Sequence, residues 1–243
     1  MVVKRYDEYI TESLDLDEQL FKACQHGDLV KVKELVGSGA NPEARSNNRV
    51  KDTPLMEACF NNKIDIVLFL LDTEKVDIDA VDVEGMSSLS YASHLGLEEM
   101  VEILLERGAN TELKDIHGYT ALMFAVMKKH LRIMRILIGG GVDIETKDKK
   151  NRTPIIMACR SDSEYTILIL LEHGSDINNF DNDKFSCLDY QFRKIWEEEY
   201  TQELIITGQP QNIKFFDDKI GILPSLKTKY KEIIEMSELG IFG

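Results

Sequence analysis

The chain has 243 residues, of which 43% are hydrophobic and 30% are charged, a composition typical of a folded globular protein and unlike that of a disordered one. Its net charge of −14 argues against general nucleic-acid binding, which depends on basic side chains that neutralise phosphates. An acidic surface that simply keeps the protein in solution is the preferred explanation of this charge.

Neither a membrane-spanning segment nor an export signal is expected. No run of about 18 apolar residues occurs, which is roughly the length needed to span a bilayer. The first residues, MVVKRYDEYITESLDLDEQ, lack the uninterrupted apolar core of a signal peptide. We therefore expect a cytoplasmic protein without membrane insertion, and a nuclear location stays open.

Residues 1–15 are expected to form a leader whose Tyr6, Tyr9 and Ile10 cover the first folded unit. Asp15 then offers a helix N-cap, and Glu18 follows three residues later, which is the capping-box pattern.

A phrase of similar residues recurs along the chain. Its opening hydroxyl residues are separated by 34, 33, 33 and 33 positions, and they are Thr53, Ser87, Thr120, Thr153 and Ser186. Two positions later an aliphatic residue follows, and five positions later a small alanine, Ala58, Ala92, Ala125 or Ala158. An earlier unit fits the same frame with Glu18 in the opening place. The spacing predicts about six repeats over residues 16–205.

Each repeat has the same predicted local structure. The hydroxyl residue caps a short helix, and a second helix follows with an apolar stripe, as in EEMVEILLERGAN. Glycines at 39, 108, 141 and 174 come where a helix end needs a positive φ, and Gly85, Gly118 and Asn151 lie at the turn of an extended connection. One such helix pair cannot bury its own apolar face, so stacking into an all-α solenoid is predicted.

These repeats resemble those of the ankyrin-repeat family. The resemblance rests on the openings TPLM, TALM and TPII, on the closings LLERGAN and LLEHGSDIN, and on the constant period. It implies helix-turn-helix units joined by β-hairpin-like turns, with partner proteins bound on a concave face. The histidine usual after the opening is replaced by Met56, Ser90, Met123, Ile156 and Asp189, so we expect more reliance on apolar packing.

Both ends of the array depart from the pattern. The first connection, NPEARSNNRVKD, is longer and lacks the turn glycine, so we expect an irregular loop. The last repeat has Gln191 in place of the alanine and adds Phe192, Trp196 and Tyr200, which favours a cap over a binding site. Residues 206–243 read as a loop and then a helix in SLKTKYKEIIEMSELG. This tail either folds back on the array, which we favour, or docks to another protein.

No catalytic, cofactor or metal site is expected. Cys24, Cys59 and Cys159 each follow the repeat's alanine, where a small core residue fits, and Cys187 stands where other repeats have proline. The cysteines and histidines show no metal-ligand spacing, no histidine recurs with a nucleophile, and no glycine-rich phosphate loop occurs.

A partner-binding groove is predicted instead. The family resemblance places it on the first helices, seven and eight positions past the hydroxyl, and on the loop tips. Its predicted apolar and aromatic members are Phe60, Met86, His94, Leu95, Ile116, His117, Tyr119 and Met127. Its predicted basic members are Lys128, Lys149, Lys150, Arg152, Arg160, Arg193 and Lys194. Such a groove suits a partner segment with hydrophobic anchors followed by acidic residues, and ordinary solvated charges remain the alternative.

The sequence therefore favours a monomeric, non-enzymatic protein-interaction module that acts as an adaptor, scaffold or inhibitor. The alternative is a substrate-targeting subunit of a larger regulatory or enzymatic complex, with the tail docking to the machinery. The resemblance also implies that Asn178 lies where oxygen-dependent hydroxylases modify asparagine in similar repeats. Other repeats carry an acidic residue there, so such a role would be confined to this one site.

Overall fold

The computed structural model describes residues 15–73, 75–161, 163–187 and 189–190, and ten helices lie within them. Two compact units make up the chain, Met1–Phe124 and Ala125–Gly243. The leader, the aromatic residues Phe192, Trp196 and Tyr200, and the tail lie outside the described residues. No helix in the described part is both long enough and apolar enough to cross a bilayer.

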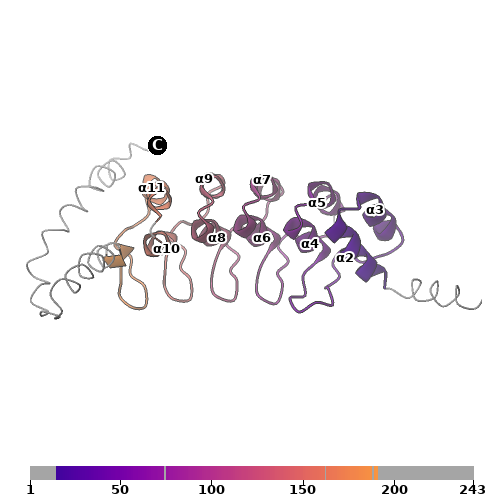
Figure 1. Ribbon diagram of the computed structural model, residues 1–243, viewed down its shortest axis with the longest axis horizontal. Helices are drawn as coiled ribbons and strands as arrows, with labels where there is room; N and C mark the ends of the chain where they lie inside the picture. Colours follow the sequence, from indigo (N-terminus) through magenta and orange to yellow (C-terminus); the bar gives the residue numbers. More distant parts are fainter. Residues whose placement is uncertain (1–14, 74, 162, 188, 191–243) are drawn as a thin grey trace, which may run out of the picture. The chain divides into compact units, whose positions relative to one another are not determined.

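The first unit consists of helix pairs. In Figure 1, α2, α4 and α6 form one row beside the connecting loops, and α3, α5 and α7 form a second row farther from the loops. The pairs are α2 (Leu16–His26) with α3 (Leu29–Gly37), α4 (Pro54–Phe60) with α5 (Ile64–Leu71), and α6 (Ser88–Leu95) with α7 (Glu98–Glu106). Helix α8 (Ala121–Lys128) begins in this unit and ends in the second. We call the first row with the loop tips the inner face, and the second row the outer helices.

Most of the predicted caps are confirmed. Thr53 and Ser87 each accept a hydrogen bond from the backbone N–H three residues later, at 3.2 Å, which fixes where α4 and α6 begin. Asp15 caps α2 by accepting from the N–H of Asp17, but the capping box is not formed, because Glu18 pairs with Lys22. Thr153 begins α10 without any side-chain cap bond, and its buried hydroxyl has no partner.

Small and aliphatic side chains fill the core as the repeat pattern predicts. Ala58 and Ala92 are completely buried, which lets neighbouring first helices approach closely. Met56 and Met123, which replace the usual histidine, are buried as well. At two other repeats this position keeps polar contacts, because the Ser90 hydroxyl lies 3.1 Å from that of Ser87 and Asp189 accepts from the Ser186 hydroxyl. Apolar packing therefore replaces the contacts of a histidine in only some of the repeats.

The connecting loops are organised by an aspartate that the sequence analysis did not single out. Asp82 accepts hydrogen bonds from the N–H groups of Glu84 and Met86, at 2.8 and 2.9 Å. Asp115, Asp148 and Asp181 occupy the same place in later repeats and make the same pair of bonds. In the first connection Asn48 takes this role, and Lys51 adopts the positive φ of 59° that glycine adopts elsewhere.

The second unit repeats the arrangement with α9 (Leu131–Gly139), α10 (Pro154–Arg160) and α11 (Glu164–Glu172). Helix α11 packs on both α9 and α10. Figure 1 shows α10 on the side of the loops, with α9 and α11 in the outer position. The core is formed by aliphatic residues at the predicted stripe positions, among them Met134, Leu137, Ile167 and Leu170.

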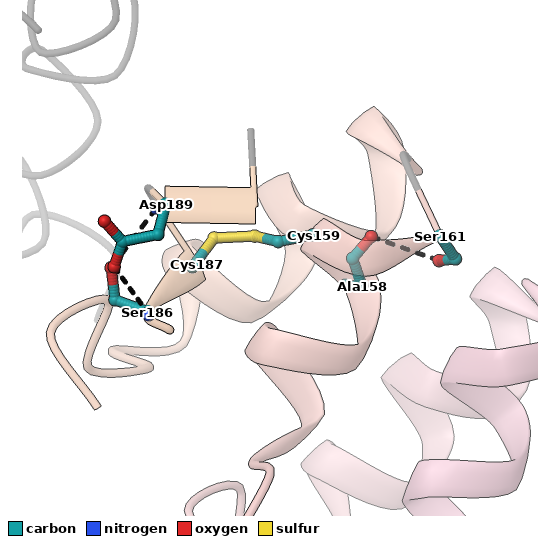
Figure 2. The surroundings of a disulfide bond; sticks show 6 residues. All are labelled: Ala158, Cys159, Ser161, Ser186, Cys187 and Asp189. Carbon is teal, nitrogen blue, oxygen red and sulfur yellow. Dashed lines mark hydrogen bonds between the residues drawn. A yellow bond between two sulfur atoms is a disulfide. The ribbon is translucent and has the colours of Figure 1, made fainter. Parts of the chain in front are cut away.

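A disulfide joins Cys159 on α10 to Cys187 at the start of the next repeat, with 5.3 Å between the Cα atoms (Figure 2). The expectation that all cysteines are plain core residues is therefore wrong for this pair. It holds for Cys24 and Cys59, which are free and buried. Burial raises the pKa of both thiols to about 12, so they are protonated and unreactive at neutral pH.

Candidate protein-binding surfaces

The inner face of the first unit carries connected aromatic rings. Phe60 contacts Tyr91 edge to face, with ring centroids 5.8 Å apart. Phe124 contacts both His94, at 5.6 Å, and Tyr119, at 5.8 Å. Such perpendicular pairs are favourable beyond the area they bury. We call the group of Phe60, Tyr91, His94, Leu95, Ile116, His117, Tyr119 and Phe124 the aromatic surface.

The Tyr91 side chain is hydrogen-bonded to the connecting loop. Its hydroxyl donates a hydrogen bond of 2.6 Å to Asp82, the same carboxylate that shapes the loop. Burial raises the pKa of Tyr91, and the bond to Asp82 raises it further, so the phenol stays neutral. The ring that supports Phe60 is thus fixed to the loop framework.

Several predicted members of the groove are open to solvent. Phe60 is 54% exposed and Ile116 is 48% exposed, and Leu95 also reaches the surface. The ring contact of Phe60 with Tyr91 distinguishes it from scattered apolar surface residues, which are ordinary in soluble proteins. Tyr119 is half-buried and His117 exposed, so both present part of their rings.

Met86 does not belong to this surface, contrary to the prediction. It is only 8% exposed. Asp82 accepts the N–H of Met86, and the Asp82 N–H donates back to the Met86 carbonyl, so the backbone returns to the core at this residue. Val83, at the loop tip, is the exposed apolar residue instead.

Tyr91 and Phe124 were missed by the sequence analysis. Both lie four positions past the opening hydroxyl, one residue before the alanine of the repeat, whereas on the first helices only positions seven and eight were considered. Because three or four residues make one helical turn, position four adjoins positions seven and eight on the same helix face. An aromatic at that position was the available signal.

Glu57 occupies the position equivalent to Tyr91 and forms a carboxyl pair with buried Asp52. Burial and, to a lesser degree, the hydrogen bond and the charge of Asp52 raise the pKa of Glu57 to about 7, while a hydrogen bond with Asn61 acts in the opposite direction. Asp52 also accepts hydrogen bonds from Ser46 and, at 2.7 Å, from Asn48. The protonated form of Glu57 therefore suits the folded chain best.

We predict that Glu57→Gln stabilises the protein above neutral pH. The pKa of a glutamate in an unfolded chain is about 4.3, well below the folded value of about 7, so folding favours protonated Glu57. The stability that Glu57 contributes is therefore full below the unfolded pKa and is lost as the pH rises through about 7. The urea midpoint of the variant should match the wild type at pH 4 and exceed it at pH 8. Glu99→Gln, on the exposed side of α7, is the control for the removal of one negative charge. An increase in the urea midpoint of Glu57→Gln that is the same at pH 4 and pH 8 would contradict the prediction.

The second unit presents basic side chains in equivalent places. Lys128, Lys149, Lys150 and Arg160 are exposed, and we call these four the basic surface. Exposed Met127 adjoins Lys128. The guanidinium of Arg160 lies 5.3 Å from the ring centroid of Tyr190, a cation–π contact that orients it.

Tyr190 is anchored as Tyr91 is in the first unit. Its hydroxyl donates a hydrogen bond of 2.5 Å to Asp181, which also accepts two loop N–H groups. Burial would raise the pKa of Asp181, but these bonds, with Arg160 nearby, lower it overall. Burial and the bond to Asp181 raise the pKa of Tyr190 to about 12, so the pair stays carboxylate and phenol.

Arg152 is a structural residue and not an exposed groove residue, contrary to the prediction. It is 9% exposed, and its Nε and Nη2 atoms lie 2.7 and 2.5 Å from Oδ2 of Asp148. The loop aspartate thus takes an arginine partner in this repeat. Arg193 and Lys194 lie outside the described residues.

Asn178 is exposed, and its amide donates to Asp176 at 3.1 Å. In the preceding repeat the same position is Glu145, whose carboxylate accepts the N–H of Asp176 at 2.8 Å and the amide of Asn179 at 2.7 Å. Acidic residues at this position brace the next loop. Modification of Asn178 stays a prediction.

The described residues contain no group of three or more His, Cys, Asp or Glu side chains placed to hold a metal ion. The two surfaces offer ring faces, apolar side chains and cations, which are groups that proteins use to bind other proteins.

Comparison with known proteins agrees with this architecture. The family model described as "Ankyrin repeats (3 copies)" matches residues 20–115 and 110–181, which is more than half of the chain. The chain is 39% identical over 62 residues to "Palmitoyltransferase AKR1" of Debaryomyces hansenii, and 30% identical over 98 residues to "Serine/threonine-protein kinase TNNI3K" of Mus musculus. These matches cover 25% and 40% of this chain but only 7% and 12% of the relatives. On the family match, the chain belongs to the ankyrin-repeat proteins.

Proposed function

We propose that the chain is a non-enzymatic protein-interaction module, an adaptor, scaffold or inhibitor, that acts as a monomer in the cytoplasm or nucleus. It binds a partner segment through the aromatic surface of the first unit and the basic surface of the second. The partner segment carries apolar anchors and acidic residues.

The aromatic surface is the observation that carries this proposal. Two sets of ring contacts join Phe60 to Tyr91, and Phe124 to His94 and Tyr119, so the exposed Phe60 and the half-buried Tyr119 each contact a neighbouring ring. Rigid aromatic groups bind with little loss of side-chain entropy, and they are enriched among residues that dominate binding energy. Ankyrin repeats mediate protein–protein binding, and this surface lies on the helices and loops where the family resemblance places partners.

The basic surface supports the acidic part of the proposed partner. In a chain of net charge −14, Lys149 and Lys150 at one loop tip and Arg160 on α10 are cations on the inner face. Complementary charge at an interface chiefly raises the association rate and selects among partners. The apolar surface therefore supplies affinity, and the basic surface supplies rate and selectivity.

Charge reversal tests the basic surface. The immobilised full chain is used to capture proteins from an extract of its own cells, and the association rate of each captured protein is measured. We expect Arg160→Glu and Lys149→Glu each to slow association by about tenfold at low salt, with less effect at high salt. Arg132→Glu on outer helix α9 is the matched control. If all three variants behave alike, the basic surface is not part of the binding site.

The relatives favour a second candidate function. The matched segments make up only 7% and 12% of a palmitoyltransferase and a protein kinase, so similar repeats occur as small parts of larger enzymes. We propose as the alternative that this chain targets substrates to a regulatory or enzymatic complex, with residues 206–243 docking to it. Deleting residues 209–243 separates the two: loss of one captured protein from a folded array supports docking, and loss of stability supports a cap.

A further inference from the structure

The disulfide lies at a recurring contact between neighbouring repeats. Cys59 and Cys159 occupy the same position, directly after the repeat's alanine. The residue beside each is the one that follows the next repeat's opening hydroxyl. That residue is Ser88 beside Cys59, where the serine hydroxyl lowers the pKa of the thiol against the larger effect of burial. It is Cys187 beside Cys159.

The pairing is therefore specific to one repeat contact in the described part of the chain. Cys24 and Cys59 have the same burial and the same place in the frame, yet remain free. An ordinary core position needs only a small side chain, which serine supplies at position 88. A second cysteine at position 187 adds chemistry that packing does not require.

The disulfide adjoins the residues that orient Arg160. Arg160 directly follows Cys159, and Tyr190 comes three residues after Cys187. Figure 2 shows the bond joining α10 to the turn in which Asp189 accepts hydrogen bonds from the N–H and hydroxyl of Ser186, at 2.7 and 2.6 Å. The covalent link thus fixes the segment that places the Tyr190 ring against Arg160.

We propose that Cys159 and Cys187 form a reversible disulfide, and that its oxidation holds Tyr190 against Arg160 and so completes this end of the basic surface. Reduction releases the segment that carries Cys187 and Tyr190 from α10. The effect on partner binding rests on the function proposed above, whereas the redox reaction and the release do not.

The reaction is thiol–disulfide exchange with a small disulfide such as oxidised glutathione. One cysteine thiolate attacks the small disulfide, forms a mixed disulfide and expels one small thiolate; the second cysteine then attacks the mixed disulfide and expels the other. The two cysteines lose two electrons and two protons, and one small disulfide becomes two small thiols. Small thiols reverse both steps. Disulfides in reducing compartments are usually transient or redox-sensing, so this chemistry is compatible with the proposed location.

Redox titration of the full chain tests the reaction. The protein is equilibrated in mixtures of reduced and oxidised glutathione, alkylated, and analysed by mass spectrometry. We expect Cys159 and Cys187 to change state together in a single two-electron transition while the chain stays folded, and Cys24 and Cys59 to stay reduced. The proposal is overturned if the pair is reduced only when the chain unfolds, or if each cysteine carries glutathione separately.

Hydrogen exchange tests the release. The Tyr190 N–H donates to the Ser186 carbonyl at 3.2 Å, so its exchange reports opening of this turn. The bond closes a separation of 28 residues, and its reduction should speed this exchange on the order of 100-fold. Cys187→Ser should exchange fast in both buffers, and Cys59→Ser should keep the redox response of the wild type. If the exchange rate of the Tyr190 N–H does not change on reduction, the proposal is overturned.

Partner binding separates this proposal from the one it deepens. Oxidised and reduced wild type are compared for association with a protein captured by the full chain. Faster association in the oxidised form, lost in Cys187→Ser, supports control of the basic surface. If reduction changes the hydrogen-exchange rate but not the rate of partner association, the Cys159–Cys187 pair is a redox site, and the proposed control of partner binding is wrong.

Discussion

Asp148→Ala is expected to lower the stability of the second unit by about 3–5 kcal/mol, because it removes the carboxylate that forms an ion pair with the buried Arg152 guanidinium. The same substitution also removes the acceptor for the N–H groups of Lys150 and Arg152, both at 2.8 Å. Urea denaturation of the full chain measures the loss, and amide exchange in α10 and α11 assigns it to this unit.

Asp115→Ala is the matched control. Asp115 makes the same pair of backbone bonds, to His117 and Tyr119, but the residue in the place of Arg152 is Tyr119. Losing these bonds alone should cost about 1–3 kcal/mol. Equal losses in the two variants would show that the Asp148–Arg152 ion pair adds nothing to the stability of the unit.

The double substitution Phe60→Ala with Tyr119→Ala is expected to weaken partner binding by roughly 100-fold or more, the scale of removing two aromatic anchors. Phe60 is exposed, and the ring centroids of Tyr119 and Phe124 lie 5.8 Å apart. The double variant therefore removes an exposed ring that can contact the partner and a ring that packs against Phe124. Titration calorimetry with a protein captured by the full chain measures the change.

Two controls accompany this measurement. Val30→Ala removes a similarly exposed apolar side chain from outer helix α3 and should leave affinity unchanged. Phe60→Ala alone removes an exposed ring and leaves the contact between Tyr119 and Phe124 in place, and it should account for much of the loss. Equal affinity of the wild type and Phe60→Ala would exclude the aromatic surface as the binding site.

The fold could be predicted because each repeat has the same pattern of helix-capping residues and small core residues. Thr53 and Ser87 cap helices through the bonds their spacing implies, and Ala58 and Ala92 are buried where the frame places small residues. Thirty-three residues of one repeat carry little information, but several repeats in register average out local exceptions such as Lys51 at a glycine position.

The binding surfaces were less predictable, because the exposure of a loop side chain depends on which backbone groups the loop aspartate binds. Met86 and Val83 are three residues apart, yet the bond from the Met86 N–H to Asp82 turns one inward and leaves the other exposed. Arg152 was assigned to solvent because charge alone does not reveal a buried partner four residues earlier.

The disulfide escaped the sequence analysis for a related reason. Cys159 and Cys187 are 28 residues apart, which is not a metal or redox spacing. Only the stacking of adjacent repeats brings the position after the alanine next to the position after the following hydroxyl. The repeat alignment shows both positions, but only the packing of the helices shows that they are in contact.

Side-chain footprinting of the full chain, alone and with a captured partner, tests the assignment of function to the inner face most directly. We predict loss of labelling at Phe60, Leu95 and Ile116, with Val30 on α3 and Tyr165 on α11 labelled as in the isolated chain. Protection of Val30 and Tyr165 with unchanged labelling of Phe60, Leu95 and Ile116 would place the partner on the outer helices and contradict the account.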